Sequence, residues 1–260
     1  LAGNTAEYLS PAEPAKTHPA GGLYVANVLG HTLSGLADIG QASGDQQAAV
    51  VSANQAELDG PVSVYVDAAD DVVYVANVRS NSIAAYRLSY PESDDTPSKL
   101  GQYPIRNNQA PLWTIRGDQS ADDITDLSGP AWLWLETKAD ATTLKTRKLL
   151  YVSNTVPGSG RTGPIGNGIA VFDITNRPSG PNSAPIGVIK SQAFRTPIAF
   201  VVDPVNKLLY VANRDHAVYG DNLGGKIMVF QFPNELLDLS NNPDNTPVRQ
   251  FWGQGETGGP

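Results

Sequence analysis

The stretch Leu208-Leu-Tyr-Val-Ala-Asn213 contains a five-residue motif that occurs four times in the chain. Its copies are Leu23–Asn27, Val73–Asn77, Leu150–Asn154 and Leu209–Asn213, and each reads Tyr-Val-Ala-Asn or Tyr-Val-Ser-Asn after its first residue. Repeats that start 50, 77 and 59 residues apart indicate a repeat architecture, in which no unit can bury its apolar faces alone. This repetition decides the class of fold.

Each complete repeat contains four apolar segments in a fixed order. The last copy has Pro197–Asp203, Leu208–Asn213, Lys226–Phe232 and Pro247–Gly253. Many segments are apolar at both alternating positions, as expected for strands that are covered on both faces. The sequence therefore predicts an all-β fold, a β-propeller of four-stranded antiparallel blades. The Asn that ends each motif suits a strand end, because its side chain can bond its own turn.

The repeats predict about 3.75 blades. We expect an extended N-terminal arm followed by one partial blade and three complete blades, at residues 1–20, 21–60, 61–129, 130–196 and 197–260. An open array would leave two apolar blade faces wet, so a partial or oligomer-completed propeller is expected. A closed four-blade ring, sealed by a strand from the arm, is the alternative. Because the chain begins at Leu1 without Met, we also expect a processed product or a fragment.

Composition excludes several classes of protein. A net charge of -8 and a pI near 4.8 argue against nucleic-acid binding, which needs clustered cations. The lack of cysteine excludes disulfides, thiolate metal sites and a cysteine nucleophile. No apolar run is long enough for membrane insertion. The lack of cysteine fits an extracytoplasmic protein, periplasmic or secreted, and is also compatible with the cytosol.

The repeats resemble the YVTN family of β-propellers, which is related to the NHL and lactonase-type propellers. The resemblance rests on the four Tyr-Val-(Ala/Ser)-Asn motifs, on third strands such as Ile169–Phe172, and on Pro-led first strands ending in Asp67 and Asp203. It covers residues 21 to 253. It implies the fold but leaves the activity open, because one propeller scaffold hosts enzymes, cofactor carriers and binding modules.

Propeller geometry places the loops between second and third strands on one face, together with the connections between blades. Function is expected on this face, because binding residues concentrate on loops that a rigid scaffold positions. The polar residues expected there are His31, Arg79, Arg161, Arg195, Asp215 and Asp221.

The segment Asn213-Arg214-Asp215-His216 follows the last motif strand directly. It is similar to the Asn-Arg-Gly-His-like segment of the lactonase-type propellers. That resemblance implies that His216 acts as a general base on water and that Arg214 holds an anionic substrate or the developing oxyanion. The structural alternative is that Arg214 pairs with Asp215 or another nearby carboxylate and orders a long loop.

One candidate cation site is visible. Asp122, Asp123 and Asp126 share a connection between blades, and oxygen-rich loops of this kind can bind Ca²⁺. The stretch lacks the glycine-punctuated spacing of a calcium loop, so a solvated loop is the alternative. No other cofactor is expected, because with three histidines and no cysteine a transition-metal site would need histidines from distant blades together with carboxylates.

The sequence favours a non-catalytic extracytoplasmic scaffold or binding protein. Its loop face would contact a protein, a polymer or a second copy, so protein binding or self-association is expected, and a small-molecule ligand is compatible with the same face. The alternative is a lactonase-like hydrolase of small lactones or sugar-acid esters, with Arg214 and His216 as its catalytic residues. Carriage of a redox cofactor is a third interpretation, which scarce histidine and absent cysteine disfavour.

Overall fold

The computed structural model describes two compact units, Leu1–Ile115 and Arg116–Pro260. Side chains are described for residues 57–87, 110–117, 125–139, 146–155, 168–214, 225–242 and 244–251. Backbone alone is described for residues 5–6, 23–27, 32–36, 49–51, 158–160, 163–165 and 252. Each unit is considered separately below.

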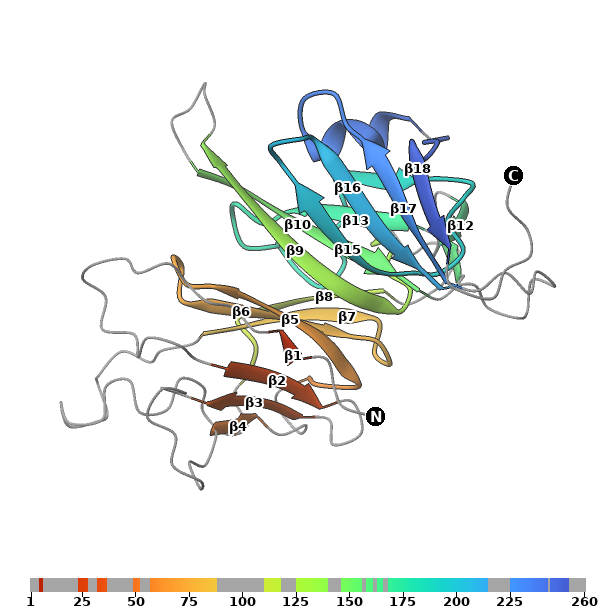
Figure 1. Cartoon of the computed structure of the whole chain (residues 1–260). Coiled ribbons are helices and arrows are strands. Elements are labelled where there is room, and N and C mark those ends of the chain that lie inside the picture. The colour runs from red at the N-terminus through yellow and green to blue at the C-terminus, as the bar shows by residue number, and fades with distance from the viewer. Residues whose placement is uncertain are drawn as a thin grey trace. The chain divides into compact units, whose positions relative to one another are not determined.

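The first unit contains two four-stranded antiparallel sheets whose strands are neighbours in chain order (Figure 1). Sheet 1 consists of β1 (Thr5–Ala6), β2 (Leu23–Asn27), β3 (Thr32–Leu36) and β4 (Ala49–Val51). Sheet 2 consists of β5 (Pro61–Asp67), β6 (Val72–Asn77), β7 (Ser82–Arg87) and β8 (Trp113–Arg116).

The second unit repeats this plan twice and adds two short elements. Sheet 3 consists of β9 (Pro130–Ala139), β10 (Thr146–Asn154), β13 (Gly168–Asp173) and β14 (Gly187–Lys190). Sheet 4 consists of β15 (Pro197–Asp203), β16 (Leu208–Asn213), β17 (Lys226–Gln231) and β18 (Arg249–Trp252). The added elements are a hairpin of β11 (Gly158–Gly160) and β12 (Gly163–Ile165), and the 3₁₀ helix η4 (Leu236–Asn241).

The prediction of four-stranded antiparallel blades is confirmed. The first sheet differs in detail, because β1 lies within the stretch expected to be an extended arm and pairs with β2. Sheet 1 therefore has four strands where the sequence predicts a partial blade. The β11–β12 hairpin lies in the connection between β10 and β13, outside the four strands expected for that blade. Within the described ranges, no helix is long and apolar enough to cross a bilayer.

Burial explains why these strands carry apolar residues at both alternating positions. In β6, Val73 and Val75 point to one face and Tyr74 and Ala76 to the other, and all four are at most 4% exposed. Residues 149–153 of β10 are buried in the same way. A half-exposed sheet would have alternated apolar and polar residues, so the continuous apolar runs follow from coverage on both faces.

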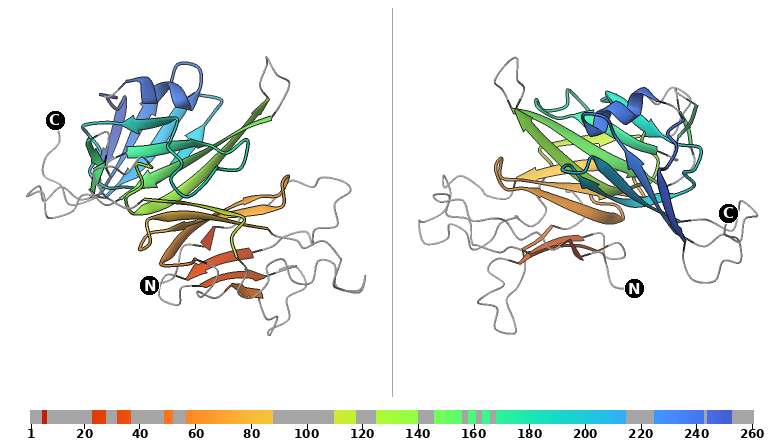
Figure 2. Two further views of the ribbon diagram at one scale, coloured as in Figure 1. Left: turned by 180° about the vertical axis from the view of Figure 1, so that it is seen from behind. Right: turned by 45° about the horizontal axis from the view of Figure 1, so that its top comes forward.

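In the second unit, sheets 3 and 4 pack face to face around one apolar core (Figure 2). Tyr151 and Ile169 contribute from sheet 3, and Val211 and Phe230 from sheet 4. The η4 helix closes one end of this core with Leu236 and Leu239. Such face-to-face packing of successive blades is the defining contact of a propeller.

Candidate functional site

Sheets 2, 3 and 4 share one arrangement at the end where the second strand meets the start of the first. The motif Asn pairs with the strand-opening Pro beside a register shift, in Pro61↔Asn77, Pro130↔Asn154 and Pro197↔Asn213. The residue after each Asn donates its backbone N–H to the carbonyl before the Pro, in Val78→Gly60 (2.9 Å), Thr155→Gly129 (3.0 Å) and Arg214→Thr196 (2.9 Å). This arrangement fixes the backbone on the side where the sequence predicts the loop face.

The Asn213 side chain holds the segment that leads into β15. It is 2% exposed, and its Oδ1 accepts the backbone N–H groups of Arg195 (2.8 Å) and Thr196 (3.1 Å). A buried amide that accepts two backbone donors satisfies groups that no strand partner reaches. Asn213 therefore positions the backbone of Arg195, while the neighbouring Arg214 is positioned through Thr196.

The same Asn has different partners in the other two sheets. In sheet 3, Asn154 Oδ1 accepts the Ser128 N–H (3.1 Å) and its Nδ2 donates to the Asp126 carbonyl (2.8 Å). In sheet 2, Asn77 Nδ2 donates to Ser82 Oγ (3.3 Å), and its buried Oδ1 has no partner. The expectation that this Asn bonds its own turn holds for Asn77. In sheets 3 and 4 the side chain instead reaches the segment before the first strand.

The backbones of Arg195 and Arg214 are both held at this end of sheet 4. Arg195 is half-buried and Arg214 is exposed, and their backbones are fixed on either side of the Asn213 amide. The framework itself does not need arginine, because Ser128 and Thr155 occupy the equivalent positions in sheet 3. The two arginines are therefore an addition to a scaffold that sheets 3 and 4 share.

The other predicted site residues fall into two groups. Arg79 is exposed after β6, and its N–H donates to the Asp59 carbonyl (3.2 Å). Asp126 is 6% exposed with a φ of 50°, and its carbonyl is the one that binds Asn154. The remaining residues lie outside the described part of the chain: His31, Asp122, Asp123, Arg161, Asp215, His216 and Asp221. Among the described residues, no three His, Cys, Asp or Glu side chains gather as a metal site would require.

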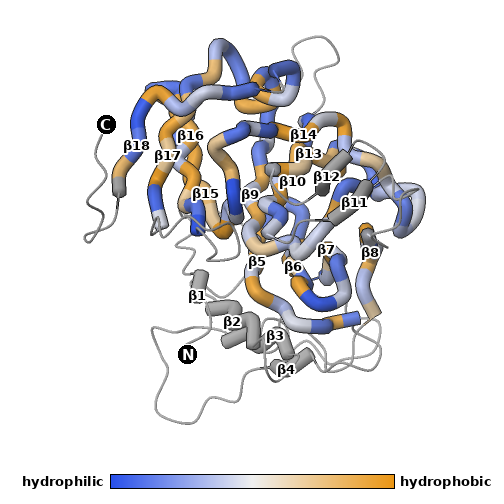
Figure 3. Tube along the Cα trace, turned by 90° about the vertical axis from the view of Figure 1, so that its right-hand side faces the viewer, coloured by the Kyte–Doolittle hydropathy of each residue, from blue (hydrophilic) through white to orange (hydrophobic). Residues whose placement is uncertain are grey.

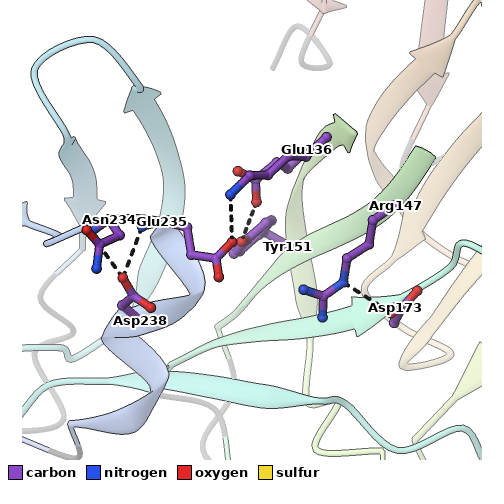
Figure 4. Close-up of polar contacts among 8 residues, drawn as sticks. Glu136, Arg147, Tyr151, Asp173, Asn234, Glu235 and Asp238 are labelled. Carbon is purple, nitrogen blue, oxygen red and sulfur yellow. Dashed lines mark hydrogen bonds and ion pairs between the residues drawn. The ribbon is translucent and has the colours of Figure 1, made fainter. Parts of the chain in front are cut away.

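A second polar cluster lies at the other end of sheets 3 and 4 (Figure 4). Tyr151 Oη donates to Glu136 Oε2 (2.8 Å), and Lys138 Nζ contacts Glu235 Oε2 (3.1 Å). Asp238 accepts the backbone N–H of Glu235 (3.0 Å) at the start of η4. The cluster thus ties β9 and β10 to the segment before η4. Its members are far apart in the sequence, so no local motif could have revealed it.

The chemistry of this cluster is structural. Burial, with the nearby Glu136 carboxylate second, raises the pKa of Tyr151 far above its ordinary value of 10.0. Tyr151 therefore stays protonated and acts as a hydrogen-bond donor. Nearby, Arg147 Nε and Asp173 Oδ2 are 3.4 Å apart on adjacent strands, a half-exposed pair of small energetic value.

No protein-family model and no curated protein matches the sequence. Solved structures do match. A protein from Lactobacillus plantarum is 16% identical with a TM-score of 0.50, over 95% of this chain and 54% of that one. Two candidate 6-phosphogluconolactonases match with lower TM-scores. The one from Bacteroides fragilis is 14% identical with a TM-score of 0.47, and the match covers 89% of this chain and 51% of that one. The one from Bacteroides uniformis is 19% identical with a TM-score of 0.46, and the match covers 89% of this chain and 54% of that one.

The sheets define the class of this protein as β-propeller-type, with four-stranded antiparallel blades in chain order. The Lactobacillus plantarum structure supports the same class at the level of the fold. The chain spans about half the length of each of the three structures. Membership of the YVTN family stays a prediction, since it rests on the repeated motifs alone.

Proposed function

We propose that this chain is a binding protein of the β-propeller class that holds an anionic ligand at the loop end of sheet 4. The observation that carries the proposal is the pair Arg195 and Arg214, whose backbones are fixed on either side of the buried Asn213 amide. A carboxylate or phosphate group is the chemistry that two guanidinium groups recognise best.

The fixed backbone matters for affinity. Binding costs free energy when loops and side chains must be ordered, so a pre-positioned backbone leaves only the side chains to be immobilised. The chain as a whole has a net charge of -8, which repels anions at long range. Any anion that binds must therefore be held by local contacts, and these contacts are expected to weaken with added salt.

Calorimetry with 6-phosphogluconate as the probe tests the proposal, because this molecule carries both a carboxylate and a phosphate. Arg214→Ala and Arg195→Ala should each weaken binding by about 10- to 100-fold, since a hydrogen bond to a charged group contributes roughly 1.5–3 kcal/mol. Arg177→Ala is the matched control, because Arg177 is an exposed cation in the β13–β14 connection, at the other end of sheet 3. Equal losses in all three variants, or no binding by the unmodified protein, would refute the proposal.

Lactone hydrolysis is the second candidate function. It is favoured by the run Arg214-Asp215-His216, whose first residue follows Asn213 with its backbone N–H held by Thr196. In this reaction His216 would take a proton from water, the hydroxide would attack the lactone carbonyl, and Arg214 would stabilise the developing oxyanion. Collapse of that intermediate would break the bond between the carbonyl carbon and the ring oxygen, the ring oxygen would take the proton back from His216, and the sugar acid would be released.

Hydrolysis of 6-phosphogluconolactone, followed against its spontaneous rate, separates the two functions. His216→Ala should abolish enzymatic turnover and leave 6-phosphogluconate binding largely intact if the chain is a hydrolase. A rate equal to the spontaneous one in the unmodified protein would eliminate the hydrolase and leave the binding proposal standing.

A further inference from the structure

Sheet 4 has one face in the core and a second face that is also apolar. Directly paired residues of antiparallel strands share a face, so Val201 lies on the same face as Tyr210, and Phe251 on the same face as Ile227. Ile227 pairs with Ala212, which lies two residues after Tyr210 in β16, so all four apolar positions share one face. They lie opposite Phe200, Val211 and Met228, which face the core shared with sheet 3. Apolar stretches along β16 and β17 are visible in Figure 3. We call Val201, Tyr210, Ile227 and Phe251 the outer face of sheet 4.

The outer face is exposed. Val201 is 63% exposed, Phe251 54% and Ile227 46%, while Tyr210 is half-buried. Polar groups surround this centre, since Asp203 and Gln231 lie at one end and Arg249 on the edge strand. An apolar centre with a polar rim is the composition of a protein–protein interface. An exposed apolar patch that no partner covers favours aggregation.

The equivalent face of sheet 3 shows what kind of partner packs on such a surface. The strand registers make Trp134, Tyr151, Ile169 and Ile189 the counterparts of Val201, Tyr210, Ile227 and Phe251. In sheet 3 these positions are covered by sheet 4, and Tyr151, Ile169 and Ile189 are 0% exposed. The partner that fits this face is therefore another four-stranded sheet that presents large apolar side chains.

We propose that the outer face of sheet 4 packs against a sheet of a second copy of this chain. A second copy supplies a sheet of the required kind, and soluble homo-oligomers are most often closed symmetric dimers. The packing of sheet 4 on sheet 3 is the precedent for this contact, because there the equivalent face is covered by a four-stranded sheet of the same kind. The inference is independent of the proposed ligand, since the outer face and the arginine pair involve different residues.

Light scattering after size exclusion tests the proposal on the full chain, over a dilution series up to the limit of solubility. The unmodified protein should show a mass of twice 27.5 kDa at high concentration and dissociate on dilution. Val201→Asp should raise the dissociation constant by about tenfold or more, because it puts a charge where an aliphatic side chain is buried in the dimer. Phe251→Asp on the edge strand β18 is the second variant, in case the first disturbs folding.

Val205→Asp is the matched control. Val205 is 86% exposed in the β15–β16 turn, so the same charge added there should leave the dimer intact. Circular dichroism establishes that each variant retains its β-sheet signal. A mass of one chain at every concentration overturns the proposal. A dimer that both outer-face variants retain, or that all three variants lose equally, also overturns it.

Discussion

Replacing the motif Asn by Ala in three sheets gives the sharpest test of the framework derived above. Asn154 and Asn213 are at most 2% exposed, and each makes at least two hydrogen bonds between its side chain and backbone groups. Asn77 is equally buried but makes a single 3.3 Å bond to Ser82 Oγ, which keeps Ser80 Oγ as a second partner at 2.9 Å. The same substitution in the same motif should therefore have unequal effects.

The magnitudes follow from these contacts. Each lost hydrogen bond costs roughly 0.5–1.5 kcal/mol, and a buried donor left unpaired costs roughly 1–3 kcal/mol. Asn213→Ala adds this second cost, because it leaves the backbone N–H of Thr196, a residue only 4% exposed, without its acceptor. We expect losses of about 2–4 kcal/mol for Asn154→Ala and Asn213→Ala, and of about 1 kcal/mol or less for Asn77→Ala.

Thermal unfolding followed by circular dichroism measures the effect, at roughly 2–4 °C per kcal/mol for proteins of this size. Hydrogen exchange at Arg195 and Thr196 localises it, because these two N–H groups lose their acceptor in Asn213→Ala. If Asn77→Ala destabilises the protein as much as the other two, the hydrogen-bond account of the motif is wrong. Unchanged exchange at Thr196 in Asn213→Ala would contradict it as well.

Two further predictions concern the second unit. Because the pKa of Tyr151 is raised, folding favours its neutral form, so its stabilising contribution is present below pH 10.0 and is lost as the pH rises above that value. Denaturant unfolding at pH 9 and pH 11 should therefore show a smaller loss of unfolding free energy in Tyr151→Phe than in the unmodified protein. An equal loss in both proteins would count against the assignment. Gly187→Ala should destabilise the contact between β14 and η4, because a Cβ at residue 187 would lie 2.8 Å from Ser240 Cβ. Thermal unfolding should show a lower Tm for this variant. Gly180→Ala is the control and should leave the Tm unchanged, because a Cβ at residue 180 meets nothing within 4 Å.

The blades could be predicted from the sequence because their signal is local and repeated. Tyr-Val-Ala-Asn together with a Pro-led segment marks the second and first strands of each blade, and continuous apolar runs such as Leu149–Val152 reveal coverage on both faces. Strand β1 could not be predicted from the sequence, because its two residues, Thr5 and Ala6, are too few to show a hydrophobic periodicity. The sequence singles out Arg214 because it directly follows the motif residue Asn213. It predicts Arg195 only as one of several polar residues on the loop face.

Sequence alone determined the class of fold, since four apolar segments recur in a fixed order and strands that are apolar on both alternating positions must be covered on both faces. The tertiary structure decided which partners each buried Asn binds, which two arginines share one sheet end, and which sheet face stays exposed. These properties depend on strand register and on contacts between residues distant in the chain, such as Tyr151 with Glu136 and Lys138 with Glu235. A local pattern specifies the strand; only the paired and packed sheets specify what each of its side chains meets.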